Sequence, residues 1–388
     1  YIPQNGTPYA LAVYAKALLA DEDHTLPAWP AGELFLQELE GLSLDGEGGP
    51  VQLTTYALVG EDVDPTYFLT DGNGDLFALI SPRFVIVREG YEAADTQLKD
   101  LAARLSTERL EAIQAATAHT YDAPLAITNV RVFDPHAKAL TEASTVTVDH
   151  GVITSVASGV TDTTGAYVVD GQGGTLVPGL IDMHGHVSQD AALKNIAAGV
   201  TLIRDMGNDN AVLSDLIGKI EDGQLAGPRI VRSGFIEGKS PFSSNNGILV
   251  KSEEEAVAAV DWYADQGDFW EIKVYNSMNP AWVPAVVKRA HERGLRVTGH
   301  VPAFTDADHM IEAGYDEMTH INQVMLGWVL AQGEDTRTLL RLTALQRLPG
   351  LDLDGPAVQH TLDLMAEKGI AIDPTYAIHE ALLKQLKK

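Results

Sequence analysis

The sequence contains no cysteine among its 388 residues. This absence excludes disulfide bonds, metal sites built from thiolates and catalysis by a cysteine nucleophile. Basic residues are also scarce, because 27 lysines and arginines stand against 54 acidic residues, which leaves a net charge of −27. A surface this negative repels a phosphate backbone, so we do not expect the chain to bind nucleic acid.

Long hydrophobic runs are missing as well. No apolar stretch approaches the roughly 20 residues that a membrane-spanning helix requires, so no span is expected. Hydrophobic residues make up 45% and charged residues 21% of the chain, which is typical of a folded protein. The chain starts at Tyr1 rather than at a methionine, which fits either a processed exported protein or a chain shortened at its start. Export to the periplasm or the cell exterior is the expectation between these two.

The pattern of apolar residues changes twice along the chain and indicates three segments. Residues 1–123 combine helical periodicity (Tyr9–Ala20, Ala93–Ala118) with β-rich runs, which predicts an α+β module of unknown role. Residues 124–174 contain short β-branched runs between turns, which predicts a small β-module. Residues 175–388 alternate strand and helix, a pattern typical of βα units around a parallel sheet.

Seven βα units can be counted in the third segment. Their predicted strands are Leu176–His184, Thr201–Met206, Arg229–Ile236, Phe269–Asn276, Arg296–Val301, Glu317–Asn322 and Ile370–Tyr376. The fold class is therefore α/β, and seven units are one short of a TIM-type (β/α)8 barrel. A doubly wound open sheet is the rival fold, but no Gly-rich phosphate loop follows the first strand.

Two histidines stand where the first predicted strand ends. His184 and His186 are two positions apart, and alternate residues of a strand point to the same face. Two imidazoles on one face at the carboxyl end of a barrel strand are placed to chelate one metal ion. Two later strands end in His300 and His320, so three strands offer histidine at the same end of the sheet.

A lysine interrupts the fourth predicted strand. Lys273 lies in the run Ile272-Lys273-Val274-Tyr275 and is expected to face the barrel interior, where burial depresses the pKa of an amine. A neutral lysine amine can take up carbon dioxide to form a carbamate, an anionic ligand able to bridge two metal ions. Tyr275 lies on the same face as Lys273; polarising a substrate carbonyl and simple packing remain equal alternatives for it.

At these residues the sequence resembles the amidohydrolase superfamily, and more closely its bacterial prolidase-like and imidazolonepropionase-like members. The resemblance extends from Ala126 to Lys388. The motifs that carry it are Pro178-Gly179-Leu180-Ile181-Asp182-Met183-His184-Gly185-His186, Arg204-Asp205-Met206-Gly207, Ile272-Lys273-Val274-Tyr275, Gly299-His300-Val301-Pro302 and Thr319-His320-Ile321-Asn322.

The resemblance implies a binuclear centre. His184 and His186 would hold the first of two divalent ions, with zinc the expected metal, and His300 and His320 the second. A carbamate on Lys273 would bridge the pair. The resemblance also implies that residues 124–174 are the first part of the β-sandwich that flanks the barrel in this family.

The implied reaction is hydrolysis of the amide bond of a small molecule (a dipeptide, an N-acyl amino acid or a cyclic amide) by a metal-bridging hydroxide. A lactonase or phosphotriesterase on the same metal centre is the alternative, and an inactive metal-binding or partner-binding homologue is another. The sequence leaves a homo-oligomer open.

One feature of the family has no counterpart in the chain. Family members carry a catalytic aspartate at the end of an eighth strand, and the sequence supplies seven. We therefore expect the barrel to be incomplete at its C-terminus, with strand eight coming from a continuation of the chain or from a second polypeptide. Asp373 in the seventh strand is interpreted as structural, and Asp182 and Asp205 as residues that orient ligands or cap loops.

Overall fold

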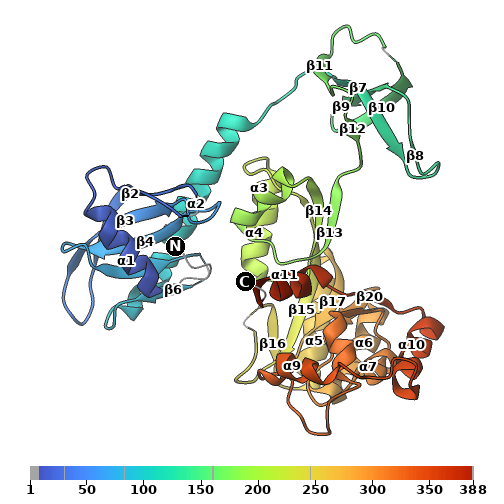
Figure 1. Ribbon diagram of the computed structural model, residues 1–388. Coiled ribbons are helices and arrows are strands. Elements are labelled where there is room, and N and C mark those ends of the chain that lie inside the picture. The colour runs from blue at the N-terminus through green and yellow to red at the C-terminus, as the bar shows by residue number, and fades with distance from the viewer. Residues whose placement is uncertain (1–7, 30, 83, 160, 245, 387–388) are drawn as a thin grey trace. The chain divides into compact units, whose positions relative to one another are not determined.

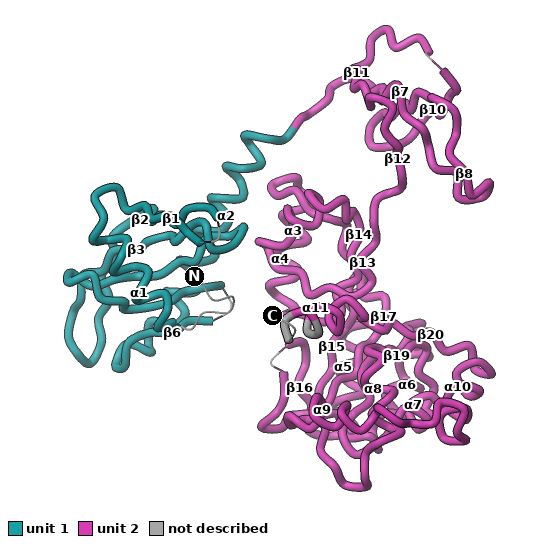
Figure 2. The backbone as a smooth tube through the Cα atoms, in the orientation of Figure 1, with its two compact units in different colours: residues 1–118 teal, residues 119–388 magenta. Residues whose placement is uncertain are grey.

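The computed structural model describes residues 8–29, 31–82, 84–159, 161–244 and 246–386. The chain divides into two compact units, residues 1–118 and residues 119–388, which are coloured separately in Figure 2. Among the described residues, no helix is both long and apolar enough to cross a bilayer.

Unit 1 is an antiparallel sheet with a helix packed against each face (Figure 1). Its elements are α1 (Pro8–Leu19), β1 (Thr25–Pro27), β2 (Glu33–Leu44), β3 (Val51–Val59), β4 (Thr66–Asp71), β5 (Leu76–Ile80), β6 (Val85–Val87) and α2 (Asp95–Thr117). A hydrophobic core lies on each face of the sheet, and successive residues of a strand point to opposite faces. Phe68 of β4 therefore packs with α1, while its neighbours Tyr67 and Leu69 pack with α2. This unit thus combines two helices with an antiparallel sheet.

Unit 2 begins with a small β-module. Its strands are β7 (Leu125–Asp134), β8 (Ala139–Leu140), β9 (Ser144–Asp149), β10 (Val152–Ser158), β11 (Tyr167–Asp170) and β12 (Thr175–Leu176). The sheet order is β10-β9-β7-β11, and β8 and β12 also pair with β7. Several apolar side chains of β10 and β11, such as Ile153 and Val168, are exposed.

A curled parallel sheet follows. Its strands are β13 (Leu180–Gly185), β14 (Val200–Asp205), β15 (Arg229–Gly238), β16 (Ile248–Val250), β17 (Phe269–Val274) and β18 (Arg296–Gly299), in the order β13-β14-β15-β17-β18 with β16 beside β15. A further parallel pair, β19 (Glu317–Thr319) and β20 (Ala371–Asp373), continues it, since the backbone amide of Asp316 donates to Val297 O of β18 at 2.8 Å. The predicted α/β class is thus confirmed, and the parallel strands form a curled half-barrel.

Helices alternate with these strands. They are α3 (Gln189–Ala197), α4 (Asn210–Glu221), α5 (Glu253–Gln266), α6 (Val283–Glu292), α7 (Ala307–Ala313), α8 (Ile321–Leu326), α9 (Leu340–Thr343), α10 (Pro356–Lys368) and α11 (Tyr376–Leu386). Ile272 and Val274 of β17 are fully buried in the main core with residues of α5 and α6. Lys273 lies between them and so faces the opposite, inner side of the sheet.

Three of the predicted strands differ most from the observed ones, and the other four differ by one or two residues at an end. The first predicted strand, Leu176–His184, is divided into β12 and β13 around Pro178, whose ring removes a ladder donor. The sixth, Glu317–Asn322, ends at Thr319 because His320 adopts a left-handed φ of 65° that turns the chain into α8. The seventh, Ile370–Tyr376, ends at Asp373, before Pro374.

Candidate metal centre

The ends of three strands bring four imidazole rings together. His184 and His186 come from the end of β13, His300 follows β18 and His320 follows β19. The ring centroids of His184 and His320 are 4.6 Å apart, as are those of His300 and His320. His186 lies 5.6 Å from His184. Strand ends at one edge of a parallel sheet explain this convergence, since side chains far apart in sequence share that edge.

The Nδ1 atom of each ring lies within hydrogen-bond distance of an oxygen. The pairs are His184 with Asp373 Oδ2 at 2.5 Å, His186 with Gly207 O at 2.6 Å, His300 with Asn276 Oδ1 at 2.7 Å and His320 with Thr375 Oγ1 at 2.8 Å. A carboxylate, a backbone carbonyl and an amide oxygen are acceptors only, so the first three rings carry their proton on Nδ1.

The same tautomer follows for His320. The hydroxyl of Thr375 donates to Pro374 O at 2.8 Å, so its oxygen accepts the Nδ1 proton of His320. In all four rings the Nε2 atom therefore keeps its lone pair. A ring nitrogen with a free lone pair and an Nδ1–H held by an oxygen is the arrangement in which histidine binds metal ions.

Lys273 lies beside His184 of this cluster. Its side chain is fully buried, and Nζ is 3.4 Å from His184 Nε2. Burial lowers the pKa of Lys273 to about 7, so much of the amine is uncharged near neutral pH. A lone pair on that nitrogen makes Lys273 a nucleophile.

The four imidazoles are held neutral. Burial is the first cause that lowers the pKa of each ring, and the charge of Lys273 adds to it in every case. The pKa of His320 falls to about 2, and that of His300 lies well below its ordinary value. Neutral imidazole is the form that coordinates a metal ion.

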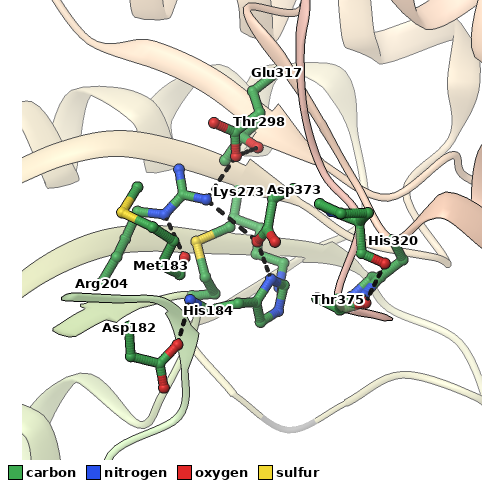
Figure 3. Close-up of polar contacts among 12 residues, drawn as sticks. Asp182, Met183, His184, Arg204, Lys273, Thr298, Glu317, His320, Asp373 and Thr375 are labelled. Atoms are coloured by element: carbon green, nitrogen blue, oxygen red, sulfur yellow. Dashed lines mark hydrogen bonds and ion pairs between the residues drawn. The ribbon is translucent and has the colours of Figure 1, made fainter. Parts of the chain in front are cut away.

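An ion-pair cluster around Arg204 lies next to the histidines (Figure 3). Arg204, 1% exposed, donates through Nη2 to Glu317 at 2.6 Å and to Asp373 at 3.3 Å, and through Nε to Met183 O at 2.7 Å. Burial by itself raises the pKa of Asp373, but the hydrogen bond with His184 and the positive charge of Arg204 leave that pKa lowered overall. Asp373 is thus an anion at neutral pH and holds the His184 ring in place.

Two aspartates of the first motifs organise the backbone. Asp205, fully buried, accepts hydrogen bonds from the amides of Val187 at 2.8 Å and Gly207 at 3.0 Å. Asp182 accepts one from the amide of His184 at 3.0 Å. Both carboxylates thus bind backbone amides of the segments around the histidines, and their interpretation as residues that orient ligands or cap loops stays a prediction.

The ring of Tyr275 packs beside a histidine. Its centroid is 4.0 Å from that of His300 and 4.8 Å from that of Phe235. Lys273 Nζ lies 5.8 Å from the Tyr275 ring. The structure thus places Tyr275 at the edge of the histidine cluster, and its catalytic role stays a prediction.

The residues fit a metal centre in their chemistry, although they do not form one by themselves. In the part of the chain that the structure describes, no three His, Asp or Glu side chains stand ready to hold a metal ion. Yet His300 Nε2 is buried without any hydrogen-bond partner. A buried polar atom left without a partner is costly, and a divalent ion of the zinc group is a natural partner for imidazole nitrogen.

Sequence reasoning missed three residues that hold the histidines. Asp373 was interpreted as structural without a place in the site, and neither Asn276 nor Thr375 was selected. Asp373 ends its strand at the same edge of the sheet as the histidines, and this position in the sequence could have indicated that it belongs to the site. Asn276 and Thr375 lie in turns after strands, where the sequence offers no comparable pattern.

Comparisons with known proteins find related chains by sequence and by structure. No family model matches the sequence. An uncharacterised protein of Mycobacterium tuberculosis is 27% identical over 206 residues, which cover 46% of this chain and 54% of that protein. A dihydroorotase of Pelobacter propionicus is 32% identical over 101 residues, 24% of each chain. The chain thus spans about half the length of the first of these relatives.

Solved structures similar to this chain include that of a Xaa-Pro dipeptidase with bound methionine. It has a TM-score of 0.49 and 21% identity, and the match covers 68% of this chain and 70% of the dipeptidase. Structures described as prolidases and as an amidohydrolase are also similar.

Proposed function

We propose that the chain contains the catalytic barrel of a metal-dependent hydrolase of the amidohydrolase superfamily, acting on an amide bond of a small molecule. The observation that supports this most is the shared tautomer of the four histidines, which leaves the Nε2 lone pair of each ring available for a metal ion. Packing alone gives no reason for four imidazoles, one of them fully buried, to be oriented in the same way by four different acceptors.

The proposed ligand set follows the strand ends. His184 and His186 would hold one divalent ion and His300 and His320 a second, with Lys273 as a bridging carbamate. When bound, such ions would polarise the amide carbonyl and activate water as the nucleophile. We propose zinc because the neutral imidazoles and the absence of cysteine favour nitrogen and oxygen ligands.

The chain's own residues prepare this site. Burial keeps the Lys273 amine partly unprotonated, as carbon dioxide uptake requires. Asp373 fixes the His184 tautomer, and Tyr275 at the cluster edge would donate a hydrogen bond to the substrate carbonyl. The low pKa of Asp373 makes it a poor proton donor at neutral pH, so its proposed role is to orient His184.

The remaining assignments accompany this proposal. We propose that residues 175–388 belong to a (β/α)8 barrel, that residues 124–174 contribute to a flanking β-sandwich, and that residues 1–123 form a separate module. Export from the cytoplasm and assembly into a homo-oligomer are also proposed and await direct measurement.

Metal-dependent amide hydrolysis is the direct test. The protein should hydrolyse members of a panel of dipeptides, N-acyl amino acids and cyclic amides, lose this activity with a chelator and regain it with Zn²⁺. His320→Ala should lose activity and bound metal, because it removes one proposed ligand. His360→Ala in α10 is the matched control, since His360 is exposed and far from any proposed ligand in sequence.

The outcome can contradict the proposal in two ways. Turnover of lactones or phosphotriesters in the same panel, without turnover of amides, would assign the centre to ester substrates. Full amide hydrolysis by metal-free protein would remove the proposed role of the histidines.

Asp373→Asn tests the orienting role. We expect Zn²⁺ affinity to fall about 10- to 100-fold, because the amide no longer favours the Nδ1–H tautomer or strengthens the ring as a ligand. Competition against a chromophoric chelator measures the affinity. Asp363→Asn, at an exposed position of α10, is the charge-matched control. An unchanged affinity in Asp373→Asn would show that His184 needs no orienting carboxylate.

A further inference from the structure

Arg341 lies in the segment between the proposed metal-ligand strand β19 and the last described strand, β20. It belongs to the short helix α9 and is half-buried. In a barrel-type sheet, segments that follow the carboxyl ends of strands surround the substrate site. Arg341 is therefore in the part of the fold where substrate-recognition residues are expected.

A buried glutamine ties Arg341 to the histidine cluster. With its amide oriented so that the oxygen faces the guanidinium, Gln323 accepts hydrogen bonds from Arg341 Nε at 2.8 Å and Nη2 at 3.0 Å. Gln323 is 2% exposed, and its backbone amide donates to His320 O at 2.9 Å. The guanidinium is thus held on a residue that is itself bonded to a proposed metal ligand.

The charge of Arg341 acts on the same cluster. After burial and the charges of Lys273 and the neighbouring histidines, Arg341 is a further cause of the lowered pKa values of His300 and His320. Its guanidinium is therefore within electrostatic reach of both rings.

No carboxylate of the described residues forms an ion pair with Arg341. Its neighbours in the same segment differ, because Arg337 is paired with Asp335 at 2.8 Å and Arg347 with Glu334 at 2.6 Å. In a chain with twice as many acidic as basic residues, a half-buried arginine that faces a neutral amide is unusual. Gln323 uses one edge of the guanidinium and leaves Nη1 for another partner.

We infer that Arg341 anchors a carboxylate of the substrate, so that the proposed hydrolase acts on amides whose amine half is an amino acid with a free carboxyl group. This inference rests on the proposed function and narrows it to N-acyl amino acids and dipeptides, at the expense of neutral cyclic amides. A guanidinium matches the planar geometry of a carboxylate and offsets the repulsion that a net charge of −27 exerts on an anionic substrate.

The test compares an acid with its neutral analogue. Binding of N-acetyl-L-alanine and N-acetyl-L-alaninamide is measured by calorimetry for the wild type, Arg341→Met and Arg341→Lys, and hydrolysis of both is followed in the metal-loaded protein. We expect Arg341→Met to weaken binding of the acid about 10- to 100-fold and to raise its KM similarly, with little change for the carboxamide. Arg341→Lys should restore part of the affinity.

Arg131→Met is the matched control. Arg131 lies in the β-module, and its side chain donates to Thr175 Oγ1 at 3.5 Å. Its removal changes the net charge equally and should leave binding of the acid unchanged. Three outcomes would overturn the inference. The wild type could bind the acid and the carboxamide with equal affinity, it could show no measurable binding of the acid, or Arg131→Met could weaken binding of the acid as much as Arg341→Met does. If the wild type hydrolyses no amide, the proposed function fails, and the binding data still decide the role of Arg341.

Discussion

Replacing Lys273 with alanine is expected to reduce amide hydrolysis at least about a hundredfold and to lower the bound metal by one ion or more per chain. Lys273 is the one group to which all four histidines respond electrostatically, and its carbamate would be the anionic ligand shared by both ions. Removing a direct ligand should cost more than the 10- to 100-fold loss typical of a residue that only orients a ligand.

Metal content by mass spectrometry and activity together measure this effect. Acetate or propionate added to Lys273→Ala should restore part of both, because a small carboxylate can occupy the space of the carbamate. Lys288→Ala, at an exposed position of α6, should behave as the wild type. Full metal content in Lys273→Ala without added acid would contradict the carbamate.

Lys273→Met, which removes the amine and keeps most of the side-chain volume, should not lose folding stability without metal. Burial lowers the pKa of Lys273 from 10.5 to about 7, so below pH 10.5 the unfolded chain holds this proton more firmly than the folded one. The wild-type residue therefore destabilises the metal-free fold, with the full cost present below about pH 7. Lys273→Met should raise metal-free stability, and more at pH 6 than at pH 9. Measuring the stability of the metal-free variant therefore distinguishes loss of metal from loss of the fold.

The second large effect concerns Arg204, and we expect Arg204→Met to destabilise the fold by about 3–5 kcal/mol at pH 8. Arg204 is 1% exposed, lies 3.5 Å from Glu271 Oε1 and binds Glu317 and Asp373. Without the guanidinium, the buried carboxylates of Glu271 and Glu317 and the partly buried carboxylate of Asp373 would lose the cation that contacts all three. Denaturant unfolding measures the loss.

The loss should shrink as the pH falls. In the variant, burial without a cation raises the folded-state pKa of these carboxyls above their unfolded values, so the folded chain binds more protons and its stability decreases with rising pH. Even with Arg204 present, burial raises the pKa of Glu271. The difference between wild type and Arg204→Met should thus be smaller at pH 5 than at pH 8, whereas Arg229→Met, at an exposed position, should change little at either pH.

A loss of stability that is the same at pH 5 and pH 8 would show that Arg204 acts through packing rather than charge. Arg204→Lys provides the second comparison. It keeps the charge but not the forked geometry, and it should therefore recover part of the stability.

Much of the site could be predicted because its signals are local in sequence. The spacing of His184 and His186 placed both at the end of one strand, and their rings are 5.6 Å apart. The lysine within a run of apolar residues predicted an inward-facing Lys273, which the structure places in the interior. Each of these inferences needs only the two-residue repeat of a strand.

Other features depended on contacts between distant segments. Asp373 is 189 residues from His184, and its bond to that ring depends on how β20 pairs with β19. The helix after His320 was mistaken for strand, because a left-handed φ at a histidine has no sequence signal. Gln323 and Arg341 were not selected, since neither belongs to a motif and their contact exists only once α8 and α9 are in place.

The sequence by itself determined the α/β class, the positions of the four histidines at strand ends and the inward direction of Lys273, because strand periodicity and composition act over a few residues. The tertiary structure alone decided which oxygen holds each imidazole, how Arg204 neutralises the buried carboxylates and which arginine lacks an acidic partner. These are outcomes of distance and burial, and such quantities arise only when segments far apart in the chain are packed together.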